Sequence, residues 1–200
     1  GVRFTVFDSA NSPGLKNSRV TSLYQTEDEV IWIGHETGDV STMSEGKFAT
    51  VRLPDAWPKS EIVAFGQDQS RDVWALNISG LLIRLRDQHL LSPPPTSDLT
   101  TVARPSLSKQ LDGPLRIVFR GAVAEINNDK LVPYDFDPTN SMNYTEQIGP
   151  SSDGTIWIIG NHLIRKWKQG TFGQSLGAYP WGQAFITTVM ETSSGLLVVC

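Results

Sequence analysis

The stretch that decides the fold is DEVIWIGHETGD, residues 28–39, because its pattern returns along the chain. Similar segments are RDVWALNISG (71–80), GPLRIVFRGA (113–122), DGTIWIIGNH (153–162) and SGLLVVC (194–200). Their central residues are Trp32, Trp74, Arg116, Trp157 and Val198, at successive spacings of 42, 42, 41 and 41 residues. Five copies at a nearly constant period indicate an internal structural repeat.

Each copy also repeats its surroundings. About 12 positions upstream of the centre lies a strand-length apolar run, such as 20–24 in the first copy. About 15 positions downstream lies another, beginning at Phe48, Leu90, Leu131 and Phe172. The turn-like sequences TEDE, QSRD, LDGP, SSDG and TSSG recur just before the centres, and Asp, Ser and Gly favour tight reversals. Each unit therefore predicts four short antiparallel strands, near 20–25, 30–35, 39–44 and 47–53 in the first.

A repeated four-stranded unit of this length is typical of a β-propeller blade. The expected fold is all-β, with four antiparallel strands and about 41–42 residues in each blade. A solenoid of helical repeats has a similar period, but strand-length runs and 17 glycines disfavour it. The tryptophans at the centres are expected to pack between neighbouring blades. The expected blades span 15–54, 60–95, 101–136 and 143–177, followed by a half blade over 183–200.

The two ends bear on whether the ring closes. GVRFTVFD, residues 1–8, resembles the outer-strand sequences GKFATVRL and GTFGQSL, so it is predicted to be the outer strand of a preceding blade. The simplest interpretation is one part of a larger propeller. In the alternative, residues 1–8 complete the fifth unit and close the ring. An open arc would leave blade edges unpaired, which favours self-association.

Composition excludes several function classes. The net charge is −4 and basic residues are not clustered, which argues against nucleic-acid binding. No apolar run is long enough to span a membrane, so membrane attachment would need parts outside this chain. The single cysteine, Cys200, excludes an intrachain disulfide and a multi-cysteine zinc site. Asp135, Asp137 and Glu146 lack the spacing of a calcium loop, and we expect neither a metal nor a cofactor.

Residues 20–48 and 151–172 resemble the two-component regulator propeller repeat, whose pattern is of the type D-x-x-G-x-[LI]-W-[IV]-G-T-x-x-G-[LI]-x-[RK]-[YW]. The matches in the fourth unit are Asp153, Gly154, Ile156, Trp157, Ile158, Leu163, Arg165 and Trp167. The first unit matches at Trp32, Ile33, Gly34 and Gly38. In that unit His35 replaces the usual small residue, and Asp28-Glu29 replaces Asp-x-x-Gly.

This resemblance implies a seven-bladed propeller in the periplasmic or extracytoplasmic input region of a bacterial two-component sensor or regulator. Histidine kinase activity would lie elsewhere in the parent protein. The chain is thus predicted to be a non-catalytic sensing or interaction module that binds a carbohydrate or another small polar ligand. The alternative is a propeller enzyme, such as a polysaccharide lyase or glycoside hydrolase. The expected innermost strands contain only two acids, Glu146 and Glu191, which favours binding because catalysis needs converging titratable groups.

The predicted ligand face follows from strand direction. Connections between blades emerge on the same face as the turns between second and third strands, because strand direction alternates within a blade. The candidate binding residues on this face are Trp57, Trp181, Tyr179, His35, Asn77, Arg120, Asn161 and His162. Aromatic, amide, imidazole and guanidinium groups suit a polar ring such as a sugar. Trp57 and Trp181 would stack on it if exposed, but leucine at their repeat position in other units favours the alternative, a buried hydrophobic plug under the connection.

Overall fold

The computed structural model describes residues 3–93, 104–109, 113–134, 136, 145–168, 170–178, 186 and 188–199. These residues form four four-stranded antiparallel sheets and one two-stranded sheet. The described part of the chain contains no helix, and therefore none long and apolar enough to cross a membrane.

The strands of each sheet follow one another in chain order. Sheet one comprises β1 (Val20–Gln25), β2 (Ile31–His35), β3 (Val40–Ser44) and β4 (Lys47–Val51). Sheet two comprises β5 (Ile62–Gln67), β6 (Val73–Asn77), β7 (Leu82–Arg84) and β8 (His89–Leu91). Sheet three comprises β9 (Ser106–Lys109), β10 (Leu115–Phe119), β11 (Ala122–Asn127) and β12 (Lys130–Pro133). Sheet four comprises β13 (Gln147–Pro150), β14 (Ile156–Gly160), β15 (Leu163–Lys168) and β16 (Thr171–Ala178), and sheet five comprises β17 (Val189–Glu191) and β18 (Leu197–Val199).

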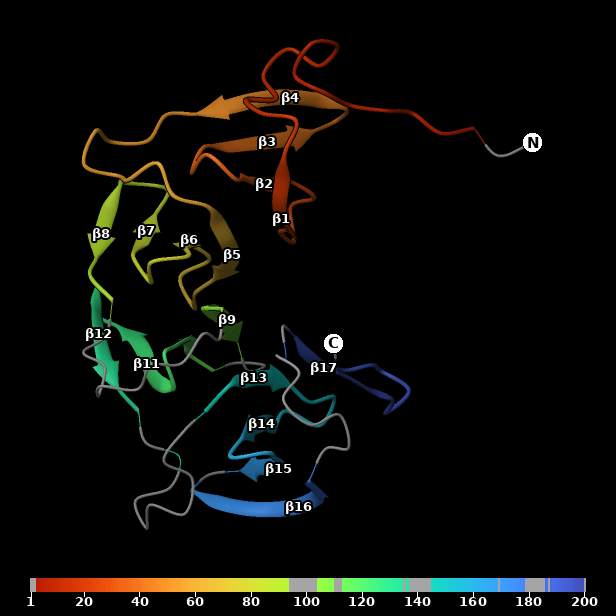
Figure 1. The fold of residues 1–200 in the computed structure, drawn as a ribbon, viewed down its shortest axis with the longest axis vertical. Helices are drawn as coiled ribbons and strands as arrows, with labels where there is room; N and C mark the ends of the chain where they lie inside the picture. The colour runs from red at the N-terminus through yellow and green to blue at the C-terminus, as the bar shows by residue number, and fades with distance from the viewer. Residues whose placement is uncertain are drawn as a thin grey trace.

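The sheets follow one another around an arc, with the first strand of each nearest its centre (Figure 1). Consecutive inner strands are in contact: β1 with β5, β5 with β9, β9 with β13, and β13 with β17. This arrangement confirms the predicted all-β propeller architecture. It also brings segments about 40 residues apart in the sequence around a common axis.

The core lies between neighbouring sheets rather than inside any one of them. For example, Trp74 and Leu82 of sheet two pack with Leu115 and Ile117 of sheet three. Because both faces of a sheet are covered, the second strands β6, β10 and β14 are buried along their whole length. A strand buried on both faces needs a nearly continuous apolar sequence, which explains runs such as IWIIG.

The repeated tryptophan position packs between blades as predicted, and Trp74 and Trp157 are buried. Each of these indoles also donates a hydrogen bond to a carboxylate: Trp74 Nε1 to Asp68 at 2.7 Å, and Trp157 Nε1 to Glu191 at 2.6 Å. Each indole ring can therefore be buried without leaving its polar N–H group unpaired.

The described N-terminal segment is not paired with any sheet in this structure. Residues 3–8 form no strand, so the outer strand expected over residues 1–8 is absent from the described part of that segment. Phe4 and Val6 are exposed, while the Phe7 ring lies 5.3 Å from that of Phe48. A segment becomes a strand only by hydrogen bonding to a neighbouring strand. Sheet one consists of β1 to β4 alone, so residues 3–8 are not paired with it. Residues 3–8 do not join β17 and β18 either, so the ring-closing alternative is not formed in this structure.

Candidate functional site

Trp57 is buried, so the plug interpretation is confirmed and the stacking role, which required an exposed indole, is wrong for this residue. Its side chain is 7% exposed, and its Nε1 donates a hydrogen bond to the carbonyl oxygen of Gly38 at 2.9 Å. Trp57 packs in the hydrophobic cluster between sheets one and two, together with Val40 and Ile62. The indole is a plug beneath the connection between the two blades.

His35 and Asn77 end the second strands of their sheets, and both are fully buried. The His35 Nε2 and Ser41 Oγ atoms form a hydrogen bond of 2.9 Å, and burial lowers the pKa of the imidazole. Asn77 Oδ1 accepts hydrogen bonds from the backbone N–H groups of Ser79 and Leu81, both at 3.0 Å. Short polar side chains commonly stabilise turns in this way. The two residues brace their turns instead of facing a ligand.

Arg120, Asn161 and His162 lie in the tight turns β10–β11 and β14–β15, with positive φ angles of 48°, 49° and 60°. Arg120 and His162 are exposed and Asn161 is half-buried. Arg120 belongs to sheet three, whereas Asn161 and His162 share one turn of sheet four. Among the described residues no group of histidines, cysteines and acids could hold a metal ion. Tyr179 and Trp181 lie outside the described residues. The predicted set is therefore not brought together as one site by the described part of the chain.

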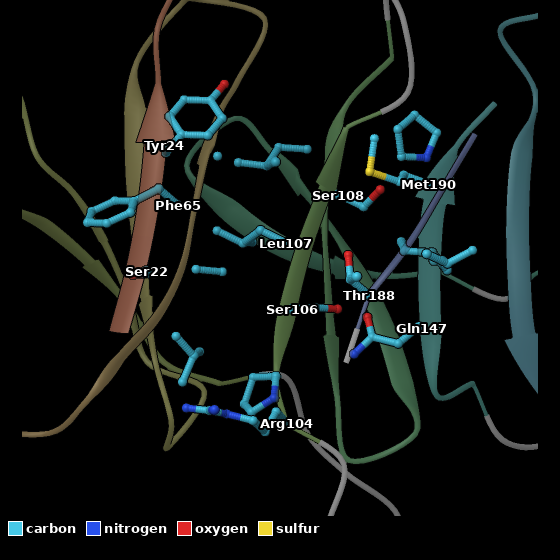
Figure 2. Close-up of a pocket in the computed structure, with 18 of the residues that line it drawn as sticks. Ser22, Tyr24, Phe65, Arg104, Ser106, Leu107, Ser108, Gln147, Thr188 and Met190 are labelled. Atoms are coloured by element: carbon cyan, nitrogen blue, oxygen red, sulfur yellow. The ribbon is translucent and has the colours of Figure 1, made fainter. Parts of the chain in front are cut away.

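A cavity of about 800 Å³ lies instead at the centre of the arc (Figure 2). Its wall contains residues from the innermost strands β1, β5, β9, β13 and β17, together with Thr188 just before β17. Small-molecule sites commonly have volumes of about 300–1,000 Å³ and occur where several elements converge. The axial cavity is thus the candidate functional site.

The wall of this cavity has an aromatic part and a polar part. Tyr24 and Phe65 lie on one side in Figure 2, and hydroxyl and amide side chains gather on the other. The labelled polar residues there are Ser106, Ser108, Gln147 and Thr188. Such a wall offers apolar contact together with several hydrogen-bonding groups.

The cavity wall is almost free of charge. Among the described lining residues, only Tyr24 and Arg104 carry ionisable side chains, and none is a carboxylate. Arg104 forms an ion pair with Glu61. Partial burial raises the pKa of the Tyr24 hydroxyl, and the nearby charge of Glu27 adds to this effect, so the phenol is neutral at physiological pH.

The two acids expected on the inner strands do not line the cavity. The Glu191 carboxylate accepts hydrogen bonds from Ser151 at 2.5 Å, Trp157 at 2.6 Å and Ser152 at 2.8 Å. These bonds hold the pKa of Glu191 at about 2, below its usual value of 4.5. Glu191 therefore connects sheets four and five, and Glu146 is half-buried beside the inner strand β13.

Sequence reasoning missed a second repeated position. Ser22, Ala64, Ser106, Gln147 and Thr188 follow one another at the same spacings as the tryptophan position, and all five line the cavity. Strand register confirms the equivalence of the first four, because each pairs with the residue two places after its blade's central residue. The sequence signal for this position is its polarity. Four of its five residues are polar, and they recur at the repeat spacing within the expected inner strands.

The sheets arranged around this axial cavity define a β-propeller. A family model described as two component regulator propeller matches residues 14–37, which span the connection into sheet one, β1 and β2. The chain thus carries a two-component regulator propeller repeat, as its sequence resemblance indicated. Among curated proteins, none matches the chain in sequence.

Several solved propellers resemble the whole described arc. Virginiamycin B lyase from Staphylococcus aureus matches with a TM-score of 0.67 and 16% identity over 90% of this chain and 62% of the lyase chain. The extracellular domain of B. thetaiotaomicron BT3049, described as a hybrid two component system, matches with a TM-score of 0.65 and 17% identity. That match covers 92% of this chain and 26% of the BT3049 chain. The WD40 β-propeller domain of Doa1 matches with a TM-score of 0.60 and 15% identity over 93% of this chain and 61% of Doa1. At these identities the likeness demonstrates the fold alone.

Proposed function

We propose that this chain is a non-catalytic ligand-sensing propeller in the input region of a bacterial two-component sensor or regulator. The two-component regulator propeller repeat at residues 14–37 supports this role. The likeness to the extracellular domain of BT3049 agrees with it and favours a periplasmic or extracellular location. The kinase or other output domain would belong to another part of the parent protein.

The observation that carries the proposal is the axial cavity, whose described lining contains no carboxylate and a single cation, Arg104, that is already paired. Its hydroxyl and amide groups suit the hydroxyls of a carbohydrate or a similar small polar ligand. Tyr24 and Phe65 provide aromatic contact for the apolar faces of a sugar ring. A ligand there would touch the inner strands of several blades together, and would thereby change how those blades pack.

A propeller enzyme is the second candidate, and the likeness to virginiamycin B lyase is the reason to consider it. Hydrolysis of a glycosidic bond generally requires two carboxyl groups that face one cleft. None of the described residues lining the axial cavity carries a carboxylate. The described lining therefore does not support hydrolysis of a glycosidic bond, and we favour binding as the function.

Calorimetric titration of the purified chain with neutral and acidic oligosaccharides tests the proposal. We expect neutral sugars to bind without being cleaved. The variant Ala64→Phe, which narrows the axial cavity, should abolish binding, whereas Val132→Phe on the exposed outer strand of sheet three should retain it. Circular dichroism and thermal unfolding check that both variants fold. Unchanged binding by a folded Ala64→Phe variant, or product formation by the wild type, contradicts the proposal.

A further inference from the structure

Among the residues that the structure describes, two polar atoms in the cavity wall are buried without a hydrogen-bond partner. They are Ser106 Oγ and Gln147 Nε2. Gln147 as a whole is only 2% exposed. Buried donors are normally paired, because an unmade hydrogen bond destabilises the folded protein. Their position in the wall of the candidate site indicates a role in binding.

The two residues occupy neighbouring inner strands. Ser106 begins β9 and Gln147 begins β13, and these strands are in contact. Figure 2 shows Ser106, Gln147 and Thr188 gathered in the same part of the cavity. Both residues line the cavity, so a ligand bound there would lie beside the two side chains.

Two other members of this repeat position, Ser22 and Ala64, do not share the feature. Ser22 Oγ donates a hydrogen bond to the carbonyl oxygen of Ile62 at 3.1 Å, and Ala64 carries no polar group. Unused donors are therefore concentrated on the β9–β13 side, opposite Tyr24 and Phe65. The repeat places one residue of each blade at the cavity wall. Because the residue type differs between blades, the two sides of the cavity have different hydrogen-bonding groups.

The low charge of the wall restricts which acceptor group of a ligand these two donors can bind. An O–H and an N–H donor require an acceptor atom on the ligand. A carboxylate would lose its hydration in the cavity without gaining a cation, because Arg104 is already paired with Glu61. An uncharged carbonyl oxygen is the acceptor that fits both conditions.

We propose that Ser106 and Gln147 together bind an uncharged carbonyl oxygen of the ligand, such as that of an acetamido group. The proposal rests on ligand binding in the axial cavity as the proposed function. Ser106 Oγ and Gln147 Nε2 each donate to the carbonyl oxygen. The sugar ring then lies toward Tyr24 and Phe65 on the aromatic side.

A comparison of thermal stability tests the unpaired state without any ligand. Ser106→Ala removes a hydroxyl that has no partner, and its Tm should equal or exceed that of the wild type. Ser22→Ala at the equivalent position breaks the bond to Ile62, and its Tm should fall by about 2–4 °C. An equal fall in both variants means that the Ser106 hydroxyl is paired, which overturns the inference.

Binding of two matched disaccharides tests the carbonyl. Di-N-acetylchitobiose carries acetamido groups where cellobiose carries hydroxyls, and we expect the wild type to bind the former more tightly by about tenfold or more. Gln147→Leu and Ser106→Ala should each remove most of this preference. Ser108→Ala, on the same strand and also in the cavity wall, should retain it.

The possible outcomes separate this inference from the proposed function. Equal binding of the two disaccharides, or a preference that survives in Gln147→Leu, overturns the carbonyl site and leaves sugar sensing intact. Failure of the wild type to bind any oligosaccharide contradicts the proposed function and the carbonyl site together. The comparison of Ser106→Ala with Ser22→Ala then still decides whether the cavity wall contains an unpaired donor.

Discussion

The repeat position that holds tryptophan in three blades holds Arg116 in sheet three. The Arg116 guanidinium lies 4.9 Å from the centre of the Tyr134 ring and is paired with Glu125 at 2.6 Å. Trp74 and Trp157 combine the same two features, a flat surface between blades and an N–H donor to a carboxylate. A guanidinium can replace an indole here because it is also planar and stacks on aromatic rings.

Arg116→Leu should lower the free energy of unfolding by about 3–5 kcal/mol, because Glu125 would remain in a mostly buried place without its cation. The double variant Arg116→Leu/Glu125→Leu should recover most of this loss, since replacing both ions by apolar groups removes the uncompensated charge. Urea denaturation of the wild type, both single variants and the double variant measures the coupling. Additive losses in the double variant would show that the two side chains do not depend on each other.

Trp57→Ala should lower the free energy of unfolding by about 3–5 kcal/mol, because it opens a cavity between sheets one and two. Ligand affinity should remain unchanged wherever the variant is folded, since Trp57 does not line the axial cavity. Lys59→Ala in the same connection is exposed, and should change stability by less than about 0.5 kcal/mol. A stable Trp57→Ala variant that has lost ligand binding would restore the stacking role.

At the scale of strands and sheets, β13 and β17 approach each other very closely. A Cβ atom added at Gly149 would lie 2.0 Å from the carbonyl oxygen of Val189. Beside this approach, Lys166 lies 3.0 Å from Asp153 and 3.4 Å from Glu191, so a charged network connects sheets four and five. The missing side chain at Gly149 permits the approach that brings the network together.

Acidification should weaken this junction. Hydrogen bonds from Ser151, and then from Trp157 and Ser152, lower the pKa of Glu191 to about 2 from its usual 4.5. A group whose pKa is lower in the folded state contributes stability above its unfolded pKa and loses it as the pH falls. The contribution should therefore decline between about pH 4.5 and pH 2. Urea denaturation across this range should give a flatter pH dependence for Glu191→Gln, and parallel curves would contradict the assignment.

Gly149→Ala should destabilise the protein by about 1–3 kcal/mol, because the added methyl group would collide with the backbone of β17. Hydrogen exchange at residues 189–191 should become faster, as β17 moves away from β13. Gly173→Ala is the control, because its added Cβ would meet only the Lys166 carbonyl oxygen at 3.9 Å. The same response in both variants would mean that close approach at Gly149 has no special importance.

At the scale of the whole molecule, separate blades create a site that no single blade contains. Hydrophobic clusters between sheets one and two, two and three, three and four, and four and five hold the arc together. The inner strands consequently enclose the cavity, and each blade contributes only a few residues to its wall. Binding energy from an axial ligand would therefore be distributed over several blades.

Hydrogen exchange with a bound ligand distinguishes the axial site from the turn face predicted by sequence. An oligosaccharide in the cavity should slow exchange in β1, β5, β9 and β13, because it touches all four strands. The outer strands β4, β8, β12 and β16 should show little change. Protection confined to the turns around Arg120 and Asn161 would instead place the ligand on the predicted face and contradict the axial site.

The period of 41–42 residues was sufficient to predict blades, strand order and interblade tryptophans, because these depend on local patterning repeated along the chain. The same pattern could not predict that His35 and Asn77 are buried at their turns, although leucine at the repeat position of Trp57 did indicate that this indole is a plug. Side-chain burial at a turn depends on the neighbouring blade, which lies about 40 residues away in the sequence.

The sequence by itself determined the repeated all-β architecture and the chemical character of the inner strands, which are apolar, hydroxyl-bearing or amide-bearing with few acids. Only the tertiary structure decided which of these groups meet. Among the described residues, it left Ser106 Oγ and Gln147 Nε2 without hydrogen-bond partners in one cavity wall, and it directed Glu191 to Trp157 and Lys166. The physical reason is that side-chain partners between two blades depend on how closely their sheets pack. The spacing between the sheets cannot be deduced from the sequence of either blade alone.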